Sequence, residues 1–162
     1  MQLRTVFPLL GPTVRHGSRP FALALAAAVS IGAAPPSPAD VVVTATGLRN
    51  AKGVVRACMT SEADHFPSCA SPDTSYNTVS DAGGTVTLTF RGVKPGRYAI
   101  ALLHDENANG KADRAAMMIP TEGFGFSRDA KVRFGPPKFR AAAFDVAPGA
   151  SEKLVIRMRY LL

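Results

Sequence analysis

The sequence predicts an all-β protein, an antiparallel β-sandwich of about seven strands with one long loop. Short runs of β-branched and other apolar residues recur along the chain, and Gly, Pro, Asp and Asn separate them. In the clearest runs apolar and polar residues alternate, which is typical of a strand with one buried and one solvated face. No segment after residue 39 sustains the 3.6-residue period of an amphipathic helix. Together these features favour two sheets packed on each other.

The first 39 residues have the composition of a secretory signal peptide. Three arginines and no acidic residue precede an apolar run, Phe21–Ala34, and small residues follow at Ser37-Pro38-Ala39. The apolar run is shorter than the roughly 20 residues of a membrane-spanning helix, although an uncleaved anchor is the alternative. We therefore expect cleavage after Ala39. This leaves a single β-sandwich domain, residues 40–162, in the periplasm or outside the cell and without a transmembrane segment.

The charge of the chain gives no nucleic-acid signature. The sequence holds 19 Lys and Arg against 12 Asp and Glu, a net charge of +7. Without the three arginines before residue 21, 16 basic residues remain against 12 acidic ones, a net charge of +4. The basic residues are scattered from Arg49 to Arg159. Nucleic-acid binding needs them clustered on one face, so we expect no nucleic-acid partner.

The first half of the domain is predicted from β-branched runs bounded by turns. Residues 40–47 (DVVVTATG) and 53–59 (GVVRACM) are the first two strands. Residues 61–75 are rich in Ser, Pro and Asp, which predicts a loop, and a short strand follows at 76–79. Residues 85–90 (TVTLTF) alternate, with Val, Leu and Phe facing inward.

The second half begins with a strand at residues 97–103, after the turn Lys94-Pro95-Gly96. The long loop spans residues 104–138. Within it only 112–119 could form a short helix, and Gly135-Pro136-Pro137 predicts an extended return, because Pro cannot donate to a strand ladder. The last two expected strands are residues 139–146 and 152–160, separated by Pro148-Gly149.

The two cysteines, Cys58 and Cys69, are predicted to form a disulfide. In an exported chain a lone pair is more often a disulfide than a metal or redox site. His65 lies between them, but two Cys and one His fall short of a structural zinc site. In the chain-entropy model a bridge closing roughly 12 residues stabilises the fold by about 3 kcal/mol.

The start of the long loop resembles part of a calcium-binding loop. The pattern Asp-x-Asn-x-Asn-Gly-x-x-Asp places oxygen side chains at the first, third, fifth and ninth positions and Gly at the sixth, which is the order in EF-hand loops. The twelfth position, where a bidentate Glu is expected, is Ala116. The predicted ligands of a weak Ca²⁺ site are the side chains of Asp105, Asn107, Asn109 and Asp113 and the backbone carbonyl of Lys111, with Glu122 closing the shell if the loop folds back. The alternative is that Asp and Asn only cap turns of the loop through their own backbone.

Two other hypotheses concern the same loop: a hydrolytic site and a ligand-binding surface. His104, Asp105, Glu122 and Ser127 are residue types that could serve hydrolysis, but adjacent residues of a strand point to opposite faces and no nucleophile elbow is present. The second reading is a ligand surface formed by His104, Phe124 and Phe126 for a protein, glycan or small molecule. The alternative for the two Phe is that they fold back over the end of the sandwich.

Four segments resemble known families. Phe90–Ala99 (FRGVKPGRYA) looks like the F-x-x-L-x-P-G-x-Y signature of transthyretin-like and collagen-adhesin B-type sandwich modules. His104–Asp113, Ile119–Ser127 and Gly135–Phe139 resemble, in the same order, the secreted bacterial family called domain of unknown function 2141. The resemblance implies a small exported β-sandwich of transthyretin-like or immunoglobulin-like type without an established activity.

From these observations we expect an exported, non-catalytic module with a binding or accessory role in the cell envelope and a weak calcium loop. The alternatives are a module in which calcium serves only folding, and a secreted hydrolase.

Overall fold

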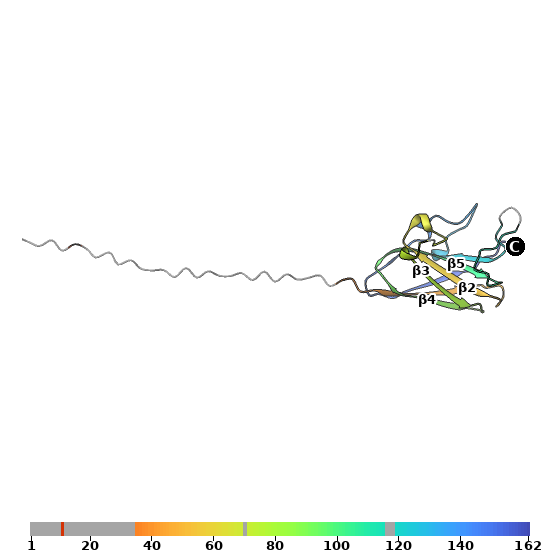
Figure 1. Cartoon of the computed structure of the whole chain (residues 1–162), viewed down its shortest axis with the longest axis horizontal. Coiled ribbons are helices and arrows are strands. Elements are labelled where there is room, and N and C mark those ends of the chain that lie inside the picture. Colours follow the sequence, from red (N-terminus) through yellow and green to blue (C-terminus); the bar gives the residue numbers. More distant parts are fainter. Residues whose placement is uncertain (1–10, 12–34, 70, 116–118) are drawn as a thin grey trace, which may run out of the picture. The chain divides into compact units, whose positions relative to one another are not determined.

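The computed structural model of the protein describes Gly11 and residues 35–69, 71–115 and 119–162. Most of the predicted signal peptide therefore lies outside the described residues and stays a prediction. Residues Ala34–Leu162 form one unit. The eight strands among its described residues lie in a three-stranded and a five-stranded sheet, which confirms the predicted all-β class and sandwich (Figure 1).

The smaller sheet has the order β4-β1-β8. Strand β1 (Ala39–Thr46) lies between β4 (Val86–Val93), which is antiparallel to it, and β8 (Glu152–Arg157), which is parallel to it. The predicted antiparallel pairing holds for the other strand pairs, and β1 with β8 is the one parallel pair among the described strands. A parallel pair needs a crossover connection, and here the chain between β1 and β8 passes through the larger sheet.

The larger sheet has the order β3-β2-β5-β6 and is antiparallel throughout. Its strands are β3 (Ser75–Asp81), β2 (Val54–Thr60), β5 (Gly96–Asp105) and β6 (Gly123–Phe126). A short strand, β7 (Phe144–Val146), pairs with the beginning of β5. In Figure 1, β2, β3 and β5 run side by side.

Strand β6 lies within residues 104–138, for which the sequence predicts a loop. Its sequence, GFGF, has low strand propensity because glycine has no side chain to pack. The glycines are required by close approach: a Cβ on Gly123 would overlap the ring of Tyr160, and one on Gly125 would lie 2.8 Å from a methyl carbon of Ile156. The chain here is a strand because a neighbouring segment packs directly against its backbone.

The expected strand at residues 139–146 is a strand only at its end. Its first residues form a single helical turn, α1 (Phe139–Ala142), followed by β7. Three consecutive alanines favour the helical turn, since Ala has the highest helix propensity. The helix considered for 112–119 includes residues 116–118, which lie outside the described residues; beside them Arg114 and Pro120 pair as a β-bridge.

Two hydrophobic clusters hold the fold together. The main core fills the space between the sheets with side chains from β1, β2, β4, β5 and β8, among them Val43, Met59, Leu88, Ile100 and Ile156. The smaller cluster lies on the outer side of the larger sheet and contains Phe66, Phe126, Phe139 and Ala142.

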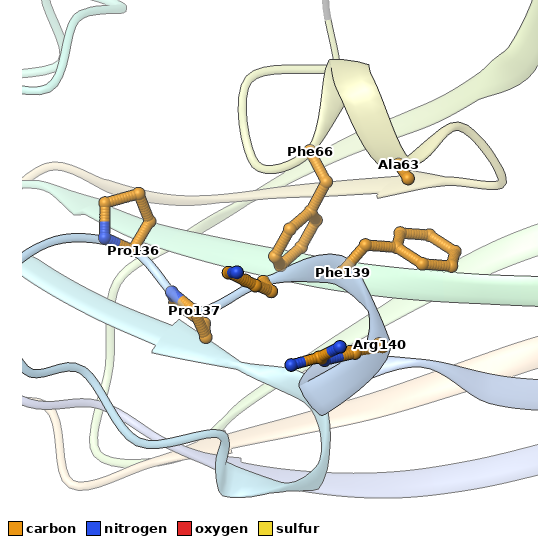
Figure 2. Close-up of a pocket in the computed structure, with 7 residues that line it drawn as sticks. Ala63, Phe66, Pro136, Pro137, Phe139 and Arg140 are labelled. Carbon is orange, nitrogen blue, oxygen red and sulfur yellow. The ribbon is translucent and has the colours of Figure 1, made fainter.

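Phe66 is the centre of the smaller cluster. Its ring meets those of Phe126 and Phe139 edge to face, with centroids 5.8 and 6.1 Å apart. Figure 2 shows Phe66 reaching from the segment around the 3-10 turn η1 (Ala63–His65) toward Phe139 and Pro137.

Cys58 of β2 and Cys69 are joined, as predicted. The bridge ties the end of the loop around η1 to the larger sheet. Across the described residues, no helix has the length and apolar character needed to cross a membrane.

Candidate functional site

The candidate site is the loop that leaves the end of β5. Asp105, the last residue of β5, is fully buried although it is an acid. The neighbouring strand β2 supplies its partner, because the Nε of Arg56 donates to an Asp105 carboxylate oxygen at 2.6 Å. Gly53, with φ of 67°, lies so close to the carbonyl of Asp105 that a Cβ would overlap it.

The Asp105 carboxylate also organises the loop backbone. One oxygen accepts the amide of Asn109 at 3.0 Å and the other accepts that of Gly110 at 2.8 Å. Burial by itself would raise the pKa of this carboxyl group. The hydrogen bonds from Arg56 and the two amides outweigh that effect and lower its pKa. Asp105 therefore holds the turn as a charged carboxylate.

Three further predicted ligands meet within the loop. The side-chain amides of Asn107 and Asn109 both donate to the same oxygen of Asp113, at 2.7 and 2.9 Å. Their side-chain oxygens accept backbone amides two residues ahead, from Asn109 and Lys111. Asn107 and Asn109 thus cap turns, as in the alternative reading, and in doing so they are gathered around Asp113.

Glu122 closes the loop from its far end. It is almost fully buried, and its two carboxylate oxygens accept the amides of Glu106 and Asp113 at 3.1 and 3.0 Å. Burial raises the pKa of Glu122, and the negative charges of Asp113 and Asp105 raise it further, against the lowering effect of the two amides. None of the ion pairs among the described residues supplies Glu122 with a basic partner.

Among the predicted calcium ligands, the side chains of Asn107, Asn109 and Asp113 contact one another. Asp105 and Glu122 contact the same loop through its backbone amides. Lys111 is exposed, and its backbone amide, not the predicted carbonyl, makes the contact with Asn109. Within the described ranges, no three side chains of the types His, Cys, Asp and Glu form a group able to hold a metal ion. A cation here would depend on the amide oxygens of Asn107 and Asn109 beside the Asp113 carboxylate. Such a set of hard oxygen ligands suits Ca²⁺ better than a transition metal.

His104 is buried beside the loop and links three segments. Its Nε2 is 2.8 Å from the carbonyl oxygen of Lys52, so this nitrogen donates. Its Nδ1 then accepts from the hydroxyl of Tyr160 at 2.7 Å, and that hydroxyl accepts the backbone amide of Arg49. Burial raises the pKa of Tyr160. Both ring nitrogens of His104 therefore make hydrogen bonds within the protein.

A second ion pair covers the loop entrance. Arg49 lies 2.7 Å from Glu106, and the side chain of Asn50 donates to the other oxygen of Glu106 at 2.9 Å. Burial would raise the pKa of Glu106, but the bonds from Asn50 and Arg49 lower it. Arg49, Arg56 and Tyr160 were missed in the sequence, since they come from distant segments that only strand pairing brings to the loop.

Ser127, a candidate nucleophile, lies away from His104. It is fully buried, accepts the amide of Ile100 at 2.9 Å and donates to the carbonyl of Ala142 at 2.6 Å. Its proton is therefore committed to a backbone carbonyl.

The expected ligand surface is largely inside the protein. His104 and Phe126 are buried, and Phe124 is partly buried against the smaller cluster. The two Phe fold back over the sheet, which is the alternative stated above.

Comparison with known families gives one match. The model of the family described as "Uncharacterized protein conserved in bacteria (DUF2141)" matches residues 43–153, from β1 into β8. No curated protein and no solved structure matches the chain significantly.

Proposed function

The chain belongs to the uncharacterised bacterial family DUF2141, and from this premise we propose that it is an exported, non-catalytic β-sandwich module that acts by binding in the cell envelope and holds a calcium ion weakly in its β5–β6 loop. The observation that carries the calcium part is the convergence of Asn107 and Asn109 on one oxygen of Asp113, in the loop whose backbone the buried Asp105 holds.

The charges of the loop support a weak site. Hydrogen bonds from amide groups now surround the Asp113 oxygen, and a cation at this position would replace them. The Glu122 carboxylate accepts the backbone amide of Asp113, and it has no ion pair with a basic side chain among the described residues. Arg56 already neutralises Asp105. We therefore expect a Kd in the range of about 10⁻⁴–10⁻³ M that extracellular modules have.

Thermal unfolding with calcium and with chelator tests the site. At ten times Kd, binding adds about 1.4 kcal/mol to the free energy of unfolding. For a domain of this size the melting temperature should rise by about 4–5 °C. Mg²⁺ should give a smaller rise, because it demands a tighter octahedral shell. The rise should shrink in acid, since protonation of Glu122, whose pKa is raised, removes a nearby negative charge.

The matched variants are Asp113→Asn and Asp129→Asn. Asp113→Asn should abolish most of the calcium-dependent rise, while Asp129→Asn, outside the loop, should keep it even if its own melting temperature falls. Asp105 is a poorer choice because it holds the loop backbone together. A melting temperature indifferent to millimolar calcium in every variant would leave the residues as turn caps only.

The non-catalytic part is supported by the partners of the two candidate catalytic side chains. His104 spends both ring nitrogens on Lys52 and Tyr160, and Ser127 donates to Ala142. A secreted hydrolase is the competing function. Hydrolysis of simple esters or glycans that disappears in Ser127→Ala, with the fold intact, would favour it.

A further inference from the structure

The segment Ala130–Arg140 has an unusual composition and position. It connects the 3-10 turn η4 (Ser127–Asp129) to α1 and reads AKVRFGPPKFR, with four basic residues and no acid. Figure 1 shows the blue chain before α1 projecting from the strands as a loop. Phe134 is fully exposed, more than any other large apolar residue described.

The base of this loop is anchored. Pro137 is buried, and Figure 2 shows it beneath Phe66, with Pro136 beside it. Phe139 packs in the same aromatic cluster. Because Pro fixes φ, the two prolines stiffen one arm of the loop. Phe134 is thus exposed on a loop whose base is held by the packing of Pro137 and Phe139.

A basic groove lies beside this segment. It has a volume of about 880 Å³, and Lys131 and Arg133 line it together with Arg157 and Arg159 from the end of the chain. The one acid among its lining residues is Asp129, which lies 3.7 Å from Arg159. Lys131, Arg133 and Lys138 are exposed and have no side-chain hydrogen bond or ion pair to another described residue. The fold therefore gathers cations that the sequence scatters.

We propose that this face docks on an anionic lipid bilayer, with Phe134 inserted at the headgroup level and the basic groove on the lipid phosphates. Aromatic rings partition into the bilayer interface, and basic residues near an anionic surface add attraction that salt screens. Exposed Leu161, which also lines the groove, adds apolar surface on the same side.

A bilayer fits these observations better than a protein partner does. A stable protein interface buries about 800 Å² on each side around an apolar centre. Here a single ring projects at the loop tip beside Arg133 and Gly135, and the apolar residues of the groove, Phe124, Val132, Met158 and Leu161, share it with four basic side chains. A single-stranded polyanion could also meet cations and stack on Phe134, so it is included below as a competitor.

The inference rests on the proposed function in one respect: a location in the cell envelope is what would bring the protein to a bilayer. It does not use the calcium loop. The binding assay is run with chelator present, so a failure of the calcium site and a failure of this surface give separate results.

The test uses vesicles of phosphatidylcholine with and without phosphatidylglycerol. The chain contains no Trp, so Phe134→Trp introduces a unique fluorescent reporter at the loop tip. We expect its emission to shift to the blue with anionic vesicles, and the shift to fade at high salt. Val79→Trp, at a half-exposed site on β3, should not shift. Binding to neutral vesicles gives the baseline: it measures membrane binding by other segments, including the apolar run before residue 35, that does not depend on anionic lipid.

Sedimentation with anionic vesicles then separates charge from insertion. Phe134→Ser should weaken binding about tenfold, and Lys131→Gln with Arg133→Gln should weaken it about fivefold for each charge removed. The matched control, Arg91→Gln with Lys94→Gln, removes the same charge from the end of β4 and the turn after it and should weaken binding much less. Melting temperatures confirm that each variant is folded.

Three results would overturn the proposal: equal binding to neutral and anionic vesicles, equal losses in the two double variants, or binding that Phe134→Ser leaves unchanged. Preference for a soluble polyanion such as single-stranded RNA over anionic vesicles, at equal charge concentration, would assign the surface to that ligand instead.

Discussion

At the scale of single residues, the β5–β6 loop depends on groups that lie against its backbone. Gly53 lets the neighbouring chain pass the carbonyl of Asp105, and Asp105 collects two loop amides and Arg56. These contacts are buried and polar, so the removal of one partner leaves another unsatisfied. The loop should therefore be sensitive to small substitutions that an exposed turn would tolerate.

Gly53→Ala should destabilise the fold by at least about 2 kcal/mol. The left-handed conformation accounts for about 1 kcal/mol, and the overlap of the new Cβ with the Asp105 carbonyl adds to it. Gly92→Ala is the control, because Gly92 has φ of 63° but open space around it. Urea unfolding should show a clearly larger loss for Gly53→Ala; equal losses would mean that the contact relaxes without cost.

Asp105→Asn should lower the free energy of unfolding by about 2–3 kcal/mol at neutral pH, since it removes a charged acceptor of three donors. The folded-state pKa of Asp105 is lowered, so its contribution is complete above the ordinary Asp pKa and is lost as pH falls through the folded value. The variant should therefore approach the parent in stability as the solution is acidified.

The control for Asp105 is Asp145→Asn. Asp145 also pairs with an arginine, Arg97 at 3.0 Å, but both side chains are more than half exposed. Its loss should cost less than about 1 kcal/mol. If the two variants lose equal stability at neutral pH, the buried network does not hold the loop.

At the scale of elements, the outer side of the larger sheet is held by contacts between segments far apart in sequence. Ser127 of η4 connects β5 to α1 through two backbone groups, and the disulfide connects β2 to the loop around η1. Phe66, Phe126 and Phe139 fill the space between them. This layer also supports the basic loop proposed to meet the bilayer.

Ser127→Ala should destabilise the protein by about 1–3 kcal/mol. It leaves the buried amide of Ile100 and the carbonyl of Ala142 without their partner. Ser151→Ala, at an exposed position, is the control and should have little effect. Chemical unfolding of both variants measures the difference, and a neutral Ser127→Ala would show that the segments do not need the hydroxyl bridge.

Replacement of both Cys58 and Cys69 by Ala should cost about 3 kcal/mol, the value expected for a loop of this length in the chain-entropy model. In the parent protein, intact mass should increase by two hydrogens after reduction. Two thiols that alkylate in the native, unreduced protein would contradict the bridge.

At the scale of the whole molecule, β1 ties the start of the domain to its end. It lies between β4 and β8, and its first residue, Ala39, is buried and paired with Val93. Cleavage of the predicted signal peptide after Ala39 would thus fall within the first strand. The rest of β1 keeps its pairs on both sides, from Val41 onward.

N-terminal sequencing of protein recovered from the periplasm or medium should begin at Asp40. The motive is the run Ser37-Pro38-Ala39 after a short apolar segment. Recovery of the chain only in the cytoplasm, or with residues before Phe21 retained, would argue against export by this signal. This outcome would leave the vesicle and calcium experiments unaffected.

Much of the fold was predictable because local chemistry favours it. The alternation in TVTLTF and the β-branched runs near residues 41 and 54 specify strands wherever one face becomes buried. The disulfide was predictable because Cys58 and Cys69 are the only two cysteines in the sequence, so no alternative pairing exists within the chain. The strand GFGF and the helical turn FRAA were missed, because their structure follows from close backbone packing and from a few alanines.

By itself the sequence determined the β class, the disulfide and the gathering of Asp105, Asn107, Asn109 and Asp113 into one loop, because each depends on neighbours close in the chain or on composition. Tertiary structure alone decided that Arg56 pairs with Asp105, that Tyr160 reaches His104, and that β8 runs parallel to β1. It also placed Arg157 and Arg159 in one groove with Lys131 and Arg133. These contacts join segments more than 20 residues apart, and their energies depend on strand register and burial, which local propensity does not specify.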